Sequence, residues 1–245
     1  MCKEYGELST KFYEITKPVG YSIEGDIEYY LEKLEGTAGR ILEAGVGTGR
    51  MLIPLSKKGL DVDGVDSSPE MLKQCKANLQ KHGTRADLYK QDLVELSLPE
   101  RYEAIIMPAG SFCLLDRKRA QETLFRFYNH LEEKGKIIID LEMPIDFKEG
   151  ELSISQIELP DNYEILLSSH SKKIDWLEQK VTYLNEYKLT KNRQLIRTEK
   201  SDFILYWYGI EEFEMKLEQI GFRDISYEIA YGKAEQGAIT FIAFK

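Results

Sequence analysis

A glycine-rich loop holds the residues of this chain that are best suited to binding a ligand. Residues 43–50 read EAGVGTGR, after a short apolar run and before a helix-like run. Glycines permit positive φ and let the backbone lie against a ligand, while the start of a helix offers free N–H groups. The pattern predicts a nucleotide-type loop, although three glycines alone also occur in ordinary tight turns.

Two better-known glycine loops do not fit this stretch. A phosphate-binding P-loop ends in Gly-Lys-Ser/Thr, whereas Gly49 is followed by Arg50 and Met51. A dinucleotide-binding loop that began at Gly45 would need glycine at position 50, where Arg50 stands. Neither loop explains the acid Glu43, two residues before the first glycine. An acid there suits a ligand that ends in a cationic amine rather than in a pyrophosphate.

Two further acids follow the next two β-like runs. Asp66 stands about 20 residues after Gly45, where a carboxylate can accept hydrogen bonds from both hydroxyls of a ribose. Asp92 is placed to accept from an exocyclic adenine amine, while the backbone N–H of Leu93 meets the ring. Taken singly, Glu43 and Asp92 could be helix-capping acids. Together with the loop, the three acids predict a ligand with an amine, a ribose and a base.

These residues resemble the class I S-adenosylmethionine (SAM)-dependent methyltransferases of the small-molecule type. The resemblance covers residues 40 to 141 and rests on EAGVGTG at 43–49, GVDSSPEML at 64–72 and QDL at 91–93. It implies SAM as the cofactor, with these motifs holding its methionine moiety, ribose and adenine. The cofactor-binding residues implied are Glu43, Gly45, Gly47, Gly49, Arg50, Asp66, Ser67, Gln91, Asp92, Leu93, Met107 and Ala109, with Tyr13 and Tyr21 as aromatic lids or simple packing residues.

The acceptor side is less defined, and no catalytic residue is predicted. Methyl transfer from a sulfonium is an in-line displacement in which the protein mainly sets geometry, excludes water and handles the acceptor's proton. An amine acceptor must arrive neutral, and a hydroxyl needs a base such as His170 or a nearby acid. Candidate acceptor residues are Phe112, His170 and Tyr206, of which Tyr206 lies in an aromatic run that could equally be core.

The elements that must position these residues predict an α/β fold. Short β-like runs at 40–44, 61–65, 86–89, 102–107 and 136–141 alternate with helix-like runs, including 50–58, one from 68 and 117–133 closed by Gly135. Strand-like runs at 152–158, 163–169, 180–189 and 193–208 then predict an antiparallel insert. We expect a Rossmann-like, seven-stranded, mostly parallel sheet flanked by helices, with this insert after the fifth strand.

The same pattern divides the chain into four segments. Residues 1–39 are predicted to form two helices that cover the cofactor site, and 40–143 the SAM-binding core. Residues 144–208 form the insert, which the resemblance makes a substrate cover, so a small-molecule acceptor is expected. Residues 209–245 supply a helix, a strand at 222–231 and a last strand at 238–244, which complete the sheet.

Composition excludes several classes of partner. The formal net charge of −9 disfavours nucleic acid and anionic membranes, and no stretch is apolar enough for a signal peptide or a membrane span. The three cysteines are scattered and the three histidines lack ligand spacing, so neither a disulfide framework nor a metal site is expected. We expect a cytoplasmic protein, either monomer or homodimer.

Three rival functions stay open at this point. One is a non-catalytic SAM sensor or pseudoenzyme that acts through a protein partner, which the sequence does not distinguish from an enzyme. A nicotinamide-dependent oxidoreductase is disfavoured by Arg50 and Glu43. A nucleic-acid methyltransferase is disfavoured by the acidic composition and by MPAG at 107–110, where many amino-methylating enzymes of that kind carry Asn-Pro-Pro-Tyr.

Overall fold

The computed structural model describes residues 5–233 and 237–245, which form two compact units. Unit 1 combines the chain up to Pro18 with Pro144–Tyr206, and unit 2 combines Val19–Met143 with Trp207–Lys245. The two predicted N-terminal helices therefore belong to different units. Helix α1 (Glu7–Thr16) belongs with the insert, and helix α2 (Asp26–Lys33) belongs with the core.

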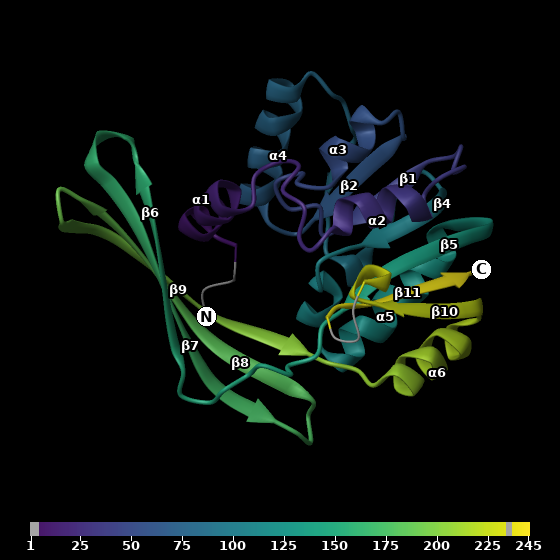
Figure 1. Cartoon of the computed structure of the whole chain (residues 1–245). Helices are drawn as coiled ribbons and strands as arrows, with labels where there is room; N and C mark the ends of the chain where they lie inside the picture. The colour runs from purple at the N-terminus through teal and green to yellow at the C-terminus, as the bar shows by residue number, and fades with distance from the viewer. Residues whose placement is uncertain (1–4, 234–236) are drawn as a thin grey trace. The chain divides into compact units, whose positions relative to one another are not determined.

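Unit 2 contains a seven-stranded sheet in the order β10-β11-β5-β4-β1-β2-β3 (Figure 1). All neighbours are parallel except β11, which pairs antiparallel with both β5 and β10. This confirms the predicted Rossmann-like fold. The strands are β1 (Ile41–Ala44), β2 (Val62–Asp66), β3 (Leu88–Lys90), β4 (Tyr102–Met107), β5 (Leu131–Leu141), β10 (Arg223–Ile229) and β11 (Ile239–Phe244).

Buried apolar runs place the strands at the centre of this unit. All four residues of β1 are buried. Consecutive residues of β4 around Ile105 and of β5 around Ile138 are also buried, so side chains on both faces of the sheet are covered. Such continuous apolar runs are typical of parallel strands that are covered on both faces. Because β1 is flanked by β2 and β4, its carboxyl end, where the glycine loop begins, lies in the middle of the sheet.

Helices cover both faces of the sheet (Figure 1). Helices α5 and α6 pack against each other, and α3 contacts both α2 and α4. Besides α2, the helices are α3 (Leu52–Lys57), α4 (Pro69–His82), α5 (Arg117–His130) and α6 (Ile210–Ile220), with short 3-10 turns η1 (Leu93–Glu95), η2 (Ser111–Leu114) and η4 (Ala230–Gly232). The predicted start of α4 is confirmed, because the Ser68 hydroxyl accepts from the Met71 backbone N–H ahead of Pro69.

The predicted helix at 117–133 was too long at its C-terminal end. Helix α5 ends at His130, and strand β5 begins at Leu131, which pairs with Tyr102 of β4. Lys134 has a φ of +66°, outside the helical region. A Cβ on Gly135 would lie 3.0–3.1 Å from three backbone oxygens. Gly135 therefore lets the chain run closely beside β4 instead of capping a helix.

Unit 1 is an antiparallel sheet with α1 packed on it. The sheet has the order β6-β7-β8-β9 (Figure 1), with β6 (Leu152–Leu159), β7 (Tyr163–Asp175), β8 (Lys180–Lys191) and β9 (Gln194–Tyr206), and η3 (Pro160–Asn162) between the first two. This confirms the antiparallel insert. Leu8 and Phe12 of α1 pack against Ile165 and Tyr187 in a separate small core.

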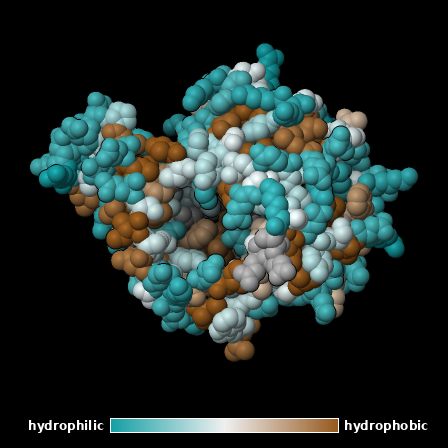
Figure 2. All heavy atoms as spheres, viewed as in Figure 1, coloured by the Kyte–Doolittle hydropathy of each residue, from teal (hydrophilic) through white to brown (hydrophobic). Residues whose placement is uncertain are grey.

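Several apolar side chains on the two edge strands of this sheet are exposed. Leu152 and Ile154 of β6, and Leu195 and Ile196 of β9, are exposed. Figure 2 shows hydrophobic residues at the surface over the strands of this sheet. In the described part of the chain, no helix is both long and apolar enough to cross a membrane.

Candidate cofactor site

The glycine loop after β1 needs its glycines. Gly45, Gly47 and Gly49 have φ values of +76°, +55° and +83°, which side-chain-bearing residues rarely adopt. A Cβ on Gly49 would also lie 2.9 Å from the Cys75 sulfur. The loop can therefore keep this path only with glycine at these positions, as its sequence predicts.

Asp66 joins the first motif to the second. Its Oδ2 accepts a hydrogen bond from the Gly47 N–H at 2.9 Å, and its Oδ1 accepts one from the Ser68 N–H at 2.8 Å. Asp66 ends β2, and the half-buried Ser67 follows it. A carboxylate has about four acceptor positions, so these two backbone hydrogen bonds alone do not fill it. The two motifs thus meet at one edge of the sheet, where sequence spacing predicted a ribose ligand.

Glu43 is a buried acid with an unused oxygen. Its side chain is 3% exposed, and in the described part of the chain its Oε2 has no hydrogen-bond partner. Burial raises the pKa of Glu43 to about 8, with smaller contributions from Asp26 and Asp66, while Arg50 acts in the opposite direction. An unsatisfied buried carboxylate oxygen is unfavourable, so the site is suited to a hydrogen-bond donor that carries positive charge.

Arg50 has a buried acidic partner that sequence reasoning missed. Its Nη2 lies 2.5 Å from Oδ2 of Asp26, and its Nη1 donates to the Tyr21 carbonyl oxygen at 2.7 Å. Both charged side chains are buried. The pair fixes the start of α2 beside the glycine loop, so Tyr21 reaches the loop through its backbone, while its ring is half exposed. Asp26 had no signal in the sequence beyond its place after Gly25.

The third motif is held by side chains that the sequence did not reveal. Both oxygens of Asp92 accept from Nη2 of Arg119, at 2.7 and 2.9 Å, and Oδ1 also accepts from the Val94 N–H. The side chain of Gln91 donates to and accepts from the backbone of Ser97. The Gln91 amide therefore bonds to the backbone of its own loop, and its role toward a cofactor stays a prediction. Arg119 joins the candidate site. Leu93, at the start of η1, is buried.

The loop after β4 lies against the glycine loop. A Cβ on Gly45 would lie 3.5 Å from the Cβ of Ser111, so these two backbones are close. Met107 is buried, and Ala109 has the unusual φ of +54° and donates its N–H to Asp140 at 2.8 Å. This is the juxtaposition expected of the end of the pocket that holds the methyl donor.

Of the four remaining predicted residues, one lies in unit 2 and three lie in unit 1. Phe112 is completely buried in an aromatic cluster, with ring centroids 5.9 Å from Tyr208 and 5.3 Å from Phe213, so its side chain offers no surface to an acceptor. Tyr13, His170 and Tyr206 belong to unit 1, in α1, β7 and β9. Their roles stay predictions.

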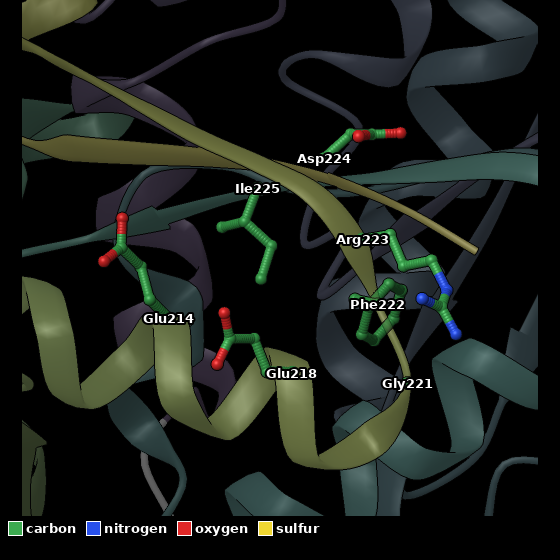
Figure 3. A pocket seen from close by; sticks show the side chains of 7 residues that line it. All are labelled: Glu214, Glu218, Gly221, Phe222, Arg223, Asp224 and Ile225. Carbon is green, nitrogen blue, oxygen red and sulfur yellow. The ribbon is translucent and has the colours of Figure 1, made fainter.

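The hollow in Figure 3 involves none of the predicted residues. It is lined by Glu214 and Glu218 of α6, by Gly221 and by residues 222–225, and its side chains are mainly charged (Figure 3). Among the residues that the structure describes, no group of three or more His, Cys, Asp or Glu side chains could hold a metal ion.

Comparison with known proteins agrees with this geometry. Residues 41–135 match the sequence model of a family described as "Methyltransferase domain". The chain is 30% identical over 105 residues to a putative methyltransferase of Geobacillus sp., and 36% identical over 121 residues to a glycine/sarcosine N-methyltransferase of Halorhodospira halochloris. These matches span 42% and 48% of this chain, and 42% and 44% of the relatives, so less than half of each relative is covered.

Solved structures extend the likeness in fold to the whole chain. A sugar N-methyltransferase from Streptoalloteichus sp. superposes with a TM-score of 0.80 at 19% identity, covering 100% of this chain and 95% of the other. A SAM-dependent methyltransferase from Clostridium acetobutylicum gives a TM-score of 0.75 at 16% identity, covering 96% of each chain. At such low identity these structures show the fold alone.

The seven-stranded sheet has the Rossmann-like methyltransferase fold, and the glycine loop lies beside acids near the ends of β1, β2 and β3. Residues 41–135 match the methyltransferase-domain model, which spans less than half of the chain. The predicted cofactor, SAM, is the one named for the Clostridium acetobutylicum structure.

Proposed function

We propose that this chain transfers a methyl group from SAM to a nitrogen or oxygen atom of a small molecule. The observation that carries the proposal is the unpartnered, buried oxygen of Glu43 directly before the glycine loop. A carboxylate so placed fits the cationic α-amino group of SAM and has no use in a phosphate-binding loop. The relatives support a small acceptor, since two of them are named as methyltransferases of glycine or sarcosine and of a sugar.

The residues of the chain divide the work of binding. Glu43 holds a cationic amine by charge, Asp66 accepts from ribose hydroxyls, and Asp92, oriented by Arg119, accepts from the amine of the base. SAM supplies a methyl group on a sulfonium, whose departure leaves a neutral thioether. The acceptor gains the methyl group and loses a proton to water or to a nearby base. The protein then needs to hold donor and acceptor in line, to exclude water from the reacting atoms and to let this proton leave, and precise approach is worth several powers of ten in rate.

The decisive measurement is calorimetric titration of the purified chain with SAM, with S-adenosylhomocysteine and with NADH. We expect the first two to bind and NADH to give no heat. Asp66→Ala should weaken both sulfur ligands at least about tenfold, because hydrogen bonds to a charged group contribute about 1.5–3 kcal/mol. Lys90→Ala is the matched control, because Lys90 is exposed and is the β3 residue that pairs with Asp66 of β2. Folded wild-type protein that binds neither ligand would overturn the proposal.

The acceptor class needs its own assay. The chain should transfer label from methyl-labelled SAM to members of a panel of small amines and alcohols, and not to protein or nucleic-acid substrates. Saturable SAM binding with no transfer to any panel member, together with capture of a protein partner that depends on SAM, would favour a sensor over an enzyme.

A further inference from the structure

Asp140, near the end of β5, is a buried carboxylate with four hydrogen-bond donors. Its Oδ1 accepts from the Tyr30 hydroxyl at 2.9 Å and from the Thr240 hydroxyl at 2.7 Å. Its Oδ2 accepts from the Ala109 N–H at 2.8 Å and from the Tyr231 hydroxyl at 3.1 Å. The side chain is 0% exposed. Four donors match the full acceptor capacity of a carboxylate.

These donors come from four different parts of unit 2. Tyr30 lies in α2, Ala109 in the loop after β4, Tyr231 in η4 and Thr240 in β11. Two of these parts belong to the candidate cofactor site. The Ala109 peptide has a strained φ of +54° and lies one residue before Gly110 and two before Ser111, which approaches the glycine loop. A non-glycine residue keeps such a φ only where its surroundings hold it.

Helix α2 carries the second connection to the site. Its first residue, Asp26, binds Arg50 of the glycine loop, and Tyr30, one turn later, binds Asp140. These two contacts connect the helix to the loop and to β5. The last residue of the helix has contacts of its own, because Lys33 pairs with Glu228 and its carbonyl oxygen accepts from Nζ of Lys136, each at 2.6 Å. Loss of the Tyr30 contact therefore loosens the middle of the helix, next to the turn that holds Arg50.

We infer that Asp140 is a positioning residue for SAM binding: through Ala109 and Tyr30 it fixes the loop after β4 and the helix that clamps Arg50. The inference rests on the proposed function. The four hydrogen bonds that Asp140 accepts involve neither a residue of the glycine loop nor Asp66. It acts by connecting two cofactor-side segments to β5 and, through Thr240, to β11.

The geometry separates a positioning role from a need for negative charge. In Asp140→Asn, the amide oxygen can face the Ala109 N–H, which cannot turn, and the amide NH₂ can face Tyr30 and Thr240. Both hydroxyls can rotate and accept instead of donate. Asparagine can therefore keep all four contacts while removing the charge. Alanine removes all four.

The test measures SAM affinity and hydrogen exchange in a set of matched variants. Tyr30→Phe cuts the link to α2, and Thr240→Val cuts the link to β11 at the same oxygen of Asp140. The two changes remove one hydroxyl each, so their effects on melting temperature should be similar. We expect Tyr30→Phe to weaken SAM binding about five- to tenfold, the equivalent of one buried hydrogen bond. Thr240→Val should stay within about twofold of wild type.

Two more observations complete the test. Without ligand, Tyr30→Phe should speed amide exchange in residues 26–33, and Thr240→Val should not. Asp140→Asn should bind SAM within about threefold of wild type, whereas Asp140→Ala should lose more than about tenfold. Since Asp140→Ala could fail to fold, Asp140→Asn and Tyr30→Phe decide the matter.

The outcomes separate the two hypotheses. If wild type binds SAM but Tyr30→Phe and Thr240→Val lower the affinity for SAM equally, Asp140 only stabilises the fold and the inference is wrong. If Asp140→Asn loses as much affinity as Asp140→Ala, charge and not position matters, and the inference is again wrong. If wild type binds no SAM, the proposed function itself fails.

Discussion

At the scale of single residues, the site is defined by acids whose environments differ. Glu43 is buried with an unpartnered oxygen, Asp66 accepts from two backbone N–H groups, and Asp92 is paired with Arg119. The positions of all three acids could be predicted, because each ends a β-like run. Two partners in the site, Asp26 for Arg50 and Arg119 for Asp92, could not be predicted, because they lie 24 and 27 residues away from the side chains that they bind. Only the fold brings such residues together.

Glu43 makes SAM binding sensitive to pH. Its pKa of about 8 means that the free protein carries a mostly protonated Glu43 at pH 7. A bound ammonium group favours the carboxylate, so binding at pH 7 should release close to one proton, and affinity should rise by up to about tenfold per pH unit between pH 6 and 7.5. Titrations at pH 7 in phosphate and in Tris, whose ionisation enthalpies differ, measure the proton release.

The control for this prediction is Glu43→Gln, which cannot release a proton. Any residual binding by this variant should give the same heat in both buffers. Equal heats for the wild-type protein in the two buffers would show that Glu43 is already ionised before SAM binds, or that it does not meet the amine.

At the scale of elements, caps and turns explain where segments begin and end. Ser68 and Pro69 mark the start of α4 in the sequence as they do in the structure, and the structure ends the helix at Gly83. The end of α5 could not be predicted from the sequence, because it depends on tertiary contacts. Leu131 pairs with Tyr102 of β4, and the backbone at Gly135 lies close to backbone oxygens of the same strand. The start of helix α1 also depends on a tertiary contact. Its first N–H groups are capped by Glu199, far away in β9, rather than by a local side chain.

Removal of this distant cap should loosen α1 selectively. Glu199 accepts from the backbone N–H groups of Leu8 and Ser9, at 3.0 and 3.2 Å, and from the Ser9 hydroxyl at 2.6 Å. Glu199→Ala should lower stability by about 1 kcal/mol, the usual effect of losing a helix N-cap, and should speed amide exchange in α1. The measurements are urea unfolding and hydrogen exchange.

A neighbouring ion pair supplies the comparison. Arg197 pairs with Glu7 across the same two elements, but both side chains are at least half exposed. Arg197→Ala should therefore change stability by less than about 0.5 kcal/mol. If Arg197→Ala were as destabilising as Glu199→Ala, general loss of charge on β9, and not capping, would explain both.

At the scale of the whole molecule, buried acids decide how stability depends on pH. Burial raises the pKa of Glu43 to about 8 and that of Asp140 to about 6, and it also raises the pKa of Asp63. The folded state thus binds these protons more tightly than the unfolded state does. Stability is greatest when they are protonated and falls as pH rises from about 4.5 to 8, by at most about 1.4 kcal/mol per pH unit for each group.

Urea unfolding from pH 5 to 9 checks this trend. We expect the free energy of unfolding to decrease across the range and to level off above about pH 8.5. Glu43→Gln should remove the part of the slope between pH 6.5 and 8. A variant with the wild-type slope there would mean that the net charge of −9, rather than Glu43, produces the loss of stability.

The order of the strands has a consequence for synthesis. Strand β11 lies between β5 and β10, so β5 gains its second neighbour only from a segment roughly a hundred residues further along the chain. While the ribosome is still adding the residues between them, Ile137, Ile138 and Ile139 of β5 form an open edge. That edge could pair with another nascent chain, and exposed strand edges of this kind are what holdase chaperones shield during translation. The free edge of β5 is therefore covered only after β11 has emerged.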